Sequence, residues 1–204
     1  DTVFFTVKQD TTRMNLRAGV INGPKNPQFS FTTILTGEIR DRDAELIAEY
    51  KNGKGETGVL LGVNARPLVG GRGKGDGLAF TLIPAEPIIA FRKFHFNENH
   101  NWIYLHKNMR VYANVDIWDD EGMGFRVHSV EGDTVSLQNI DVEIRRIRLD
   151  EITSVLPYFP EITGLFSAEA HYIQTEKDLQ LSAEASIDEL TYERQRIGDV
   201  ALGA

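Results

Sequence analysis

The sequence predicts an all-β protein: an elongated, meandering antiparallel sheet folded over into an apolar groove, with at most one or two short helices. Two observations support this prediction. Apolar and polar residues alternate over many short stretches, as they do on strands that bury one face. Between these stretches, glycine, proline, asparagine and aspartate recur, and these residues favour tight turns.

The C-terminal part alternates most clearly. Residues 140–149 read as one extended segment, and residues 166–172 and 179–187 each place small or apolar side chains on one face. The quartet Ser-Ala-Glu-Ala occurs twice, at 167–170 and 182–185. This weak internal repeat predicts a row of similar strands that share one apolar face.

A single stretch has the spacing of a helix. In residues 150–156, the apolar side chains of Ile152, Val155 and Leu156 fall on one side, and acidic residues precede them. Pro157 and Pro160 then end the helix, because proline cannot continue the hydrogen-bond pattern.

The remaining strands follow from the same alternation and from the turns between them. Asn52-Gly53 is a strong hairpin signal and predicts an antiparallel pair on either side. The polar residues 97–101 predict a further turn. The expected strands outside the C-terminal part cover residues 3–7, 14–20, 29–35, 44–50, 59–63, 102–106, 110–118, 125–130 and 135–140.

Composition and charge narrow the function classes. The 204 residues carry a net charge of −8, which disfavours nucleic acid as a partner because phosphate contacts need clustered Lys and Arg. The chain has no cysteine, so disulfides and cysteine-based metal sites are excluded. It begins with Asp and its last residues continue the alternation. We therefore expect residues 1–204 to be a single internal fragment of a longer, repeat-like β protein.

Sites for phosphate, metals and catalysis are weakly indicated. The glycine-rich stretch 70–77 fits neither the dinucleotide fingerprint nor the phosphate loop, so a loop between strands is the favoured interpretation. His95, His100 and His106 lack zinc-site spacing and are interpreted as surface residues. The acidic residues 116–121 do not match the calcium-loop pattern and predict an acidic turn. We expect no enzyme activity, no cofactor and no metal.

The shared apolar face has two interpretations. It can form the core of a sandwich of two sheets, or one sheet can curl into a groove whose inside stays partly open. In the second case small residues such as Ala168 and Ala170 leave room for a ligand. The candidate lining residues are Val111, Ala113, Val115, Ile117, Phe125, Val127, Leu179, Leu181, Ala183, Ala185 and Ile187.

The C-terminal part resembles the AsmA-like superfamily of diderm bacteria, and most closely its TamB branch, the translocation and assembly module proteins of Bacteroidetes. Residues 90–204 carry the resemblance in motifs of Leu, Gly and Asp. These are Leu-Gln-Asn-Ile-Asp-Val at 137–142, Leu-Pro-Tyr-Phe at 156–159, Ile-Thr-Gly-Leu at 162–165, Ile-Asp-Glu-Leu-Thr-Tyr at 187–192 and Ile-Gly-Asp-Val at 197–200.

The resemblance implies a periplasmic segment of a cell-envelope protein whose full-length form is anchored in the inner membrane by a helix outside this fragment. The apolar groove would shield phospholipid acyl chains during transfer between the inner and outer membranes, or support outer-membrane assembly. An Omp85-type outer-membrane protein is an implied partner through regions outside the fragment. One alternative is a chaperone-like scaffold whose strand edges pair with outer-membrane protein strands. A weaker one is a carbohydrate-binding β-sandwich that uses Trp102, Tyr112 and Trp118.

Overall fold

The computed structural model describes residues 1–24, 29–68, 76–130, 133, 135–156 and 158–204. These residues form one 14-stranded sheet and one short helix. The elements in chain order are β1 Thr2–Gln9, β2 Arg13–Asn22, β3 Phe31–Arg40, β4 Asp43–Asn52, β5 Thr57–Leu68, β6 Gly77–Ile89, β7 Arg92–Lys93, β8 His95–His106, β9 Val111–Trp118, β10 Gly124–Ser129, β11 Gln138–Arg148, α1 Leu149–Ser154, β12 Ile162–Gln174, β13 Leu179–Tyr192 and β14 Gln195–Gly203.

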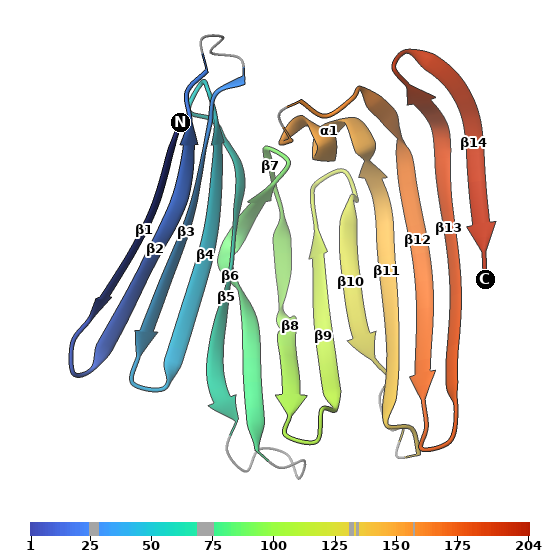
Figure 1. Cartoon of the computed structure of the whole chain (residues 1–204). Helices are drawn as coiled ribbons and strands as arrows, with labels where there is room; N and C mark the ends of the chain where they lie inside the picture. The colour runs from blue at the N-terminus through green and yellow to red at the C-terminus, as the bar shows by residue number, and fades with distance from the viewer. Residues whose placement is uncertain (25–28, 69–75, 131–132, 134, 157) are drawn as a thin grey trace.

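The sheet is an uninterrupted antiparallel meander. Each strand pairs with the strand before it in the sequence, apart from β8, which pairs with β6; the two-residue strand β7 also pairs with β6 and lies off this path. The strands β1 and β14 form the two free edges, and the sheet stays open between them (Figure 1). The predicted all-β class, the meandering antiparallel order and the single short helix are therefore confirmed.

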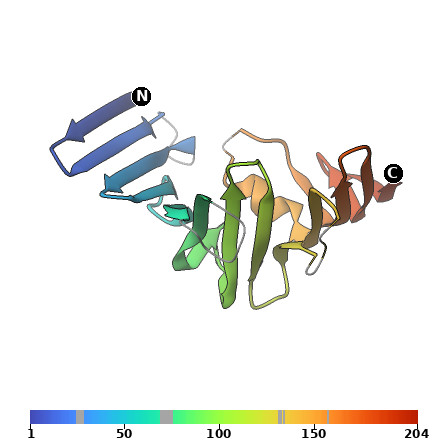
Figure 2. The ribbon, with the colours of Figure 1, turned by 90° about the horizontal axis from the view of Figure 1, so that it is seen from below.

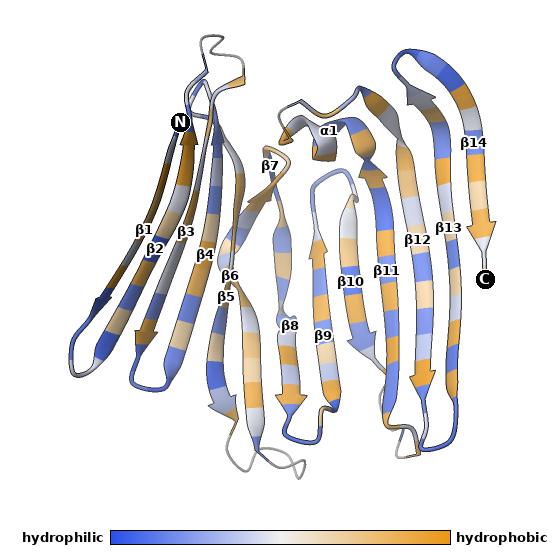
Figure 3. Ribbon diagram, in the orientation of Figure 1, coloured by the Kyte–Doolittle hydropathy of each residue, from blue (hydrophilic) through white to orange (hydrophobic). Residues whose placement is uncertain are grey.

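The strands of the main path share one face that carries apolar side chains, and the N-terminal strands also carry some on the opposite face, such as Phe4, Ile34 and Ile47. Residues that pair across an antiparallel ladder point to the same side. Val115 of β9 pairs with Val127 of β10, which pairs with Val142 of β11, then Ala170 of β12 and Ala183 of β13. Figure 3 shows the resulting bands of alternating hydropathy along the strands. We call the side that carries these residues the apolar face and the opposite side the outer face.

The sheet is curved, with the apolar face on the inside. Figure 2 shows strands β1–β4 and β12–β14 as two walls and β8 and β9 as the floor of a trough, with α1 on the concave side. Burial follows this shape. Ala113, Val115 and Ile117 on the floor strand β9 are 2–4% exposed, whereas Phe5 on the edge strand β1 is 69% exposed.

A bulge in β11 supports the packing at the α1 end. The ladder between β11 and β12 shifts between Ile144 and Ile147, and Arg146 has a positive φ of 50°. A bulge inserts an extra residue, so Ile144 and Ile147 both point to the apolar face although they are three positions apart. Ile147 packs there against the buried cluster of Phe94, Ile117 and Met123.

The two copies of the Ser-Ala-Glu-Ala quartet lie side by side. Ala168 pairs with Ala185 and Ala170 with Ala183 across the β12–β13 ladder. The repeat therefore marks two adjacent strands, and its four alanines form a block of small side chains on the apolar face.

Four local predictions need correction or lie outside the description. The helix runs over Leu149–Ser154 and not over 150–156. The polar residues 97–101 form part of β8, where the ladder to β9 is irregular between Phe96 and Asn101. The strand expected at 135–140 begins only at Gln138, where the long strand β11 starts. Most of the glycine-rich stretch, residues 70–75, lies outside the described residues.

Candidate functional site

The eleven residues predicted to line a groove all lie on the apolar face. Val127 and Phe125 pair with Val115 and Ile117 on the floor strand. The residues of β13 pair with positions of β12 that face the same way as Val142 and Ile144 of β11. The set comprises Val111, Ala113, Val115 and Ile117 on β9, Phe125 and Val127 on β10, and Leu179, Leu181, Ala183, Ala185 and Ile187 on β13.

The set is incomplete because the apolar face continues through the whole chain. On the C-terminal side, β11 contributes Val142 and Ile144 between β10 and β12. On the N-terminal side, Ile103 pairs with Ala113 and with Phe80, and the ladders continue to β1. The alternation of most of these strands was visible in the sequence, but β6, Gly77–Ile89, was not expected as a strand, and only the register shows that all of them share one face.

Exposure along the apolar face rises from the floor to the walls. Val115 is 2% exposed, Phe125 38% and Leu181 60%. No second sheet covers the face among the described residues, so the two-sheet alternative is not the observed architecture. The walls therefore offer accessible apolar surface above a dry floor.

A charged cluster around Arg92 closes the α1 end of the floor. The Arg92 guanidinium lies 2.7 Å from Asp119, 2.8 Å from Glu121 and 2.9 Å from Glu151 of α1. Its hydrogen bond with Glu121, together with the charges of Glu151 and Asp119, raises the pKa of Arg92 despite its partial burial. Asp119 is buried and accepts hydrogen bonds from the backbone N–H groups of Glu121 and Met123, so it holds the β9–β10 turn.

The acidic stretch 116–121 covers the end of β9 and the turn after it, and its carboxylates have basic side chains as partners. Asp116 is paired with Arg145 on β11, and Asp120 lies 3.1 Å from the ring of His95. Asp119 and Glu121 both contact Arg92. This pairing explains the dense acidic sequence without a bound cation. No group of three or more metal-ligating side chains with suitable geometry occurs in the part of the chain that the structure describes.

The histidines differ in their surroundings. His106 was expected at the surface, but it is only 3% exposed, and its ring meets that of Tyr112 edge-on at 5.4 Å. The surface interpretation of His106 is therefore wrong. Sequence spacing could not reveal this, because the ring of His106 packs against Tyr112 of the neighbouring strand β9.

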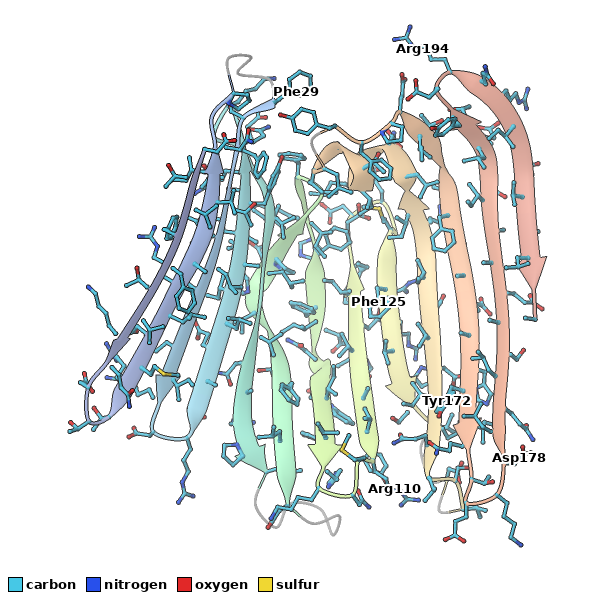
Figure 4. The ribbon with its side chains drawn as sticks, viewed as in Figure 1. Phe29, Arg110, Phe125, Tyr172, Asp178 and Arg194 are labelled. Atoms are coloured by element: carbon cyan, nitrogen blue, oxygen red, sulfur yellow. The ribbon has the colours of Figure 1, made fainter. Side chains whose placement is uncertain are left out.

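An aromatic row lies on the apolar face at the α1 end. Tyr50 contacts Phe31 on one side and Phe91 on the other, with ring centroids 6.0 and 6.4 Å apart. Burial raises the pKa of Tyr50. Figure 4 places Phe29 at this end, where its ring stacks on Tyr158 at 5.0 Å, and Arg110 and Asp178 at the opposite end. The Phe29–Tyr158 contact joins the β2–β3 connection to the segment after α1.

The aromatic residues considered for carbohydrate binding lie on the outer face of β8 and β9. Trp102 stacks on Tyr104 with ring centroids 4.5 Å apart, and Tyr112 contacts the buried His106. Trp102 and Tyr112 therefore bury part of their ring surface in these contacts. Because one sheet replaces the sandwich, and Trp102 and Tyr112 are already in ring contacts, this alternative gains no support.

The outer face of the C-terminal strands is strongly acidic. Glu143, Glu169 and Glu184 occupy directly paired positions on β11, β12 and β13. They border a polar hollow of about 480 Å³ that also contains His171 and Asp141. Like charges directly opposite each other destabilise a ladder. This hollow is too polar to suit an acyl chain.

Replacing the central carboxylate should stabilise the sheet. We expect Glu169→Gln to raise the free energy of unfolding by about 0.5 kcal/mol at low salt, because it removes two cross-strand repulsions. Urea unfolding at low and high salt measures this change. Glu176→Gln, in the β12–β13 turn, is the matched control and should change little. A loss of stability in Glu169→Gln would show that the carboxylate has a favourable partner.

The fold and this face define a class: all-β proteins with an open, curved sheet and one continuous apolar surface. The sequence matches no protein-family model, no curated protein and no solved structure. The resemblance to the AsmA-like superfamily and its TamB branch therefore stays a prediction. None of the described helices has the length and hydropathy needed to cross a membrane.

Proposed function

We propose that the apolar face binds phospholipid acyl chains, and that the protein shields them in the periplasm during transfer between the inner and outer membranes. The observation that carries this proposal is the continuity of the face: successive ladders, with local register shifts, place apolar side chains on one face from β1 to β14, and no second sheet covers that face among the described residues. Support for outer-membrane assembly, with an Omp85-type partner, belongs to the same proposal.

The energetics suit a lipid. Each methylene removed from water contributes about 0.8 kcal/mol, so a chain of about 16 carbons gains on the order of 10 kcal/mol in a dry site. Adjacent strands present apolar side chains at matching positions, such as Val127 on β10, Val142 on β11 and Ala170 on β12. We expect that an acyl chain can therefore shift from one strand to the next with little change in its own buried area, while the lipid head group stays in water.

Photocrosslinking on one strand tests this proposal. A diazirine amino acid at Leu179 or Leu181 faces the trough, and at Gln180 or Ser182 it faces outward; all four positions on β13 are exposed. With vesicles of dioleoyl phosphatidylcholine, we expect lipid adducts by mass spectrometry at Leu179 and Leu181 only. Equal labelling at the four positions, or none, would contradict an acyl-binding face.

The second candidate is a scaffold that pairs with strands of outer-membrane proteins. In residues 1–204 the two outermost strands of the sheet, β1 and β14, are eight and nine residues long, contain no proline, and expose Phe5 (69%) and Leu202 (74%). Edge strands of this kind accept a further strand. A photoreactive residue at Thr6 or Ala201 should then capture an unfolded outer-membrane β-barrel protein, while Ser182 should not.

A further inference from the structure

The floor of the trough contains a cavity of which the predicted lining includes only Val115. It has a volume of about 160 Å³ and lies between β5, β6, β8 and β9. Its side chains come from positions that face inward in the ladder register, so it lies on the apolar face. The inward-facing lining residues are Val63, Phe80, Leu82, Asn101, Ile103 and Val115, and Thr81 completes the lining.

The cavity exists because two strands separate at this point. The ladder between β6 and β8 ends at the pair Phe80–Ile103. Beyond it, the side chain of Asn101 takes the place of a strand partner: its Oδ1 accepts a hydrogen bond from the N–H of Leu82, and its Nδ2 donates one to the Leu82 carbonyl, both at 2.9 Å. The side-chain amide spans a gap that main chain would otherwise fill, and this leaves the space beside it.

The cavity is apolar and suited to a dry ligand. Asn101 supplies its only polar side chain apart from Thr81, whose register position faces outward, and both ends of the Asn101 amide are engaged by Leu82. A water molecule needs two to four polar partners, and apolar cavities of about 150 Å³ stay dry and accept benzene or xenon. Val115 on its floor is 2% exposed, which excludes bulk water from that side.

We propose that this cavity seats the methyl end of an acyl chain. The inference rests on the proposed function and makes it more specific: Val115 lines the cavity and pairs with Val127 on the apolar face, so the cavity is built into the same face on which the chain is proposed to lie. The seat fixes one end of the chain at the floor. The rest of the chain then extends over the wall towards water.

Methyl NMR of the chain labelled at Ile, Leu and Val tests the proposal with two probes, benzene and dodecanoate. We expect both to cause saturable shifts of the methyl signals of Val63, Leu82, Ile103 and Val115. Val115→Phe fills the cavity and should abolish the shifts at the other three residues. Val135→Phe, the same change at a position that is 81% exposed and outside the strands, should leave them intact.

A milder variant covers the case in which Val115→Phe does not fold, as judged by thermal unfolding. Val63→Leu adds one methylene to the cavity and should weaken the binding of both probes. Unchanged shifts in this variant would overturn the assignment of the cavity.

The two probes separate this inference from the proposed function. Dodecanoate shifts confined to β11–β13 would leave acyl binding in place but overturn the seat. Benzene shifts in the cavity with no dodecanoate shift anywhere would overturn both the acyl identity of the ligand and the proposed function. The absence of benzene shifts at all four residues would overturn the cavity as a binding site.

Discussion

Replacing Arg92 with methionine is expected to lower the free energy of unfolding by about 3 kcal/mol. The substitution keeps most of the side-chain stem but removes the charge that faces Asp119, Glu121 and Glu151. Asp119 is only 3% exposed, so its carboxylate would remain buried without a cation. An uncompensated buried charge costs far more than the loss of a surface ion pair.

Urea unfolding followed by far-ultraviolet circular dichroism measures this loss. The neighbouring Lys93→Met is the control, because Lys93 is 70% exposed and its distance to Glu86 is 3.9 Å. It should change stability by less than about 0.5 kcal/mol. Arg92→Lys keeps the charge but cannot reach three carboxylates at once, so we expect an intermediate loss. Equal stability of Arg92→Met and Lys93→Met would show that the cluster does not hold the α1 end together.

The second large effect is expected at Asn101. Asn101→Leu has a similar size but removes both hydrogen bonds to Leu82, so one backbone N–H and one carbonyl lose their partners. Each partly buried group left unsatisfied costs about 1–3 kcal/mol, and we expect a total loss of about 3 kcal/mol. Hydrogen exchange should localise the change, with the amide of Leu82 losing protection more than its neighbours on β6.

Two further variants separate geometry from polarity at this position. Asn101→Asp keeps an acceptor for the N–H of Leu82 but places a carboxylate oxygen against the Leu82 carbonyl, so it should be destabilised nearly as much as Asn101→Leu. Asn99→Leu, at an exposed side chain two residues earlier, should change stability by less than about 0.5 kcal/mol. A stable Asn101→Leu protein would mean that β6 and β8 can close their ladder without the amide.

The fold class could be predicted because alternation and turn residues are local signals. Asn52-Gly53 correctly predicted the β4–β5 hairpin, and the alternation at 110–118 matched β9 closely. Local signals failed where side chains replace main-chain partners. The polar stretch 97–101 suggested a turn, yet Asn101 uses its amide to complete the sheet at Leu82. Only the hydrogen bonds to Leu82, 19 residues earlier in the sequence, explain why position 101 is polar.

The candidate site was predictable in its chemistry but not in its extent. Alternation identified which residues of β9 and β13 share a face with their neighbours, whereas the cavity near Ile103 depends on where one ladder ends. The bulge at Arg146 shows the same limit. A strict period of two would turn Ile147 outward, and only the positive φ of 50° at Arg146 explains its inward position.

The order of the strands has a consequence for how such a protein can change in length. Since each strand from β1 to β14 pairs with its sequence neighbour, apart from β7, stability is close to a sum of nearest-neighbour interfaces. A hairpin can be gained or lost within the array while every later strand keeps its direction and its inward-facing side chains. A single inserted strand would reverse the direction of all that follow. The adjacent Ser-Ala-Glu-Ala copies on β12 and β13 are compatible with duplication of such small units during evolution. The number of strands, and with it the length of the apolar surface, can therefore change while the length of each strand stays the same.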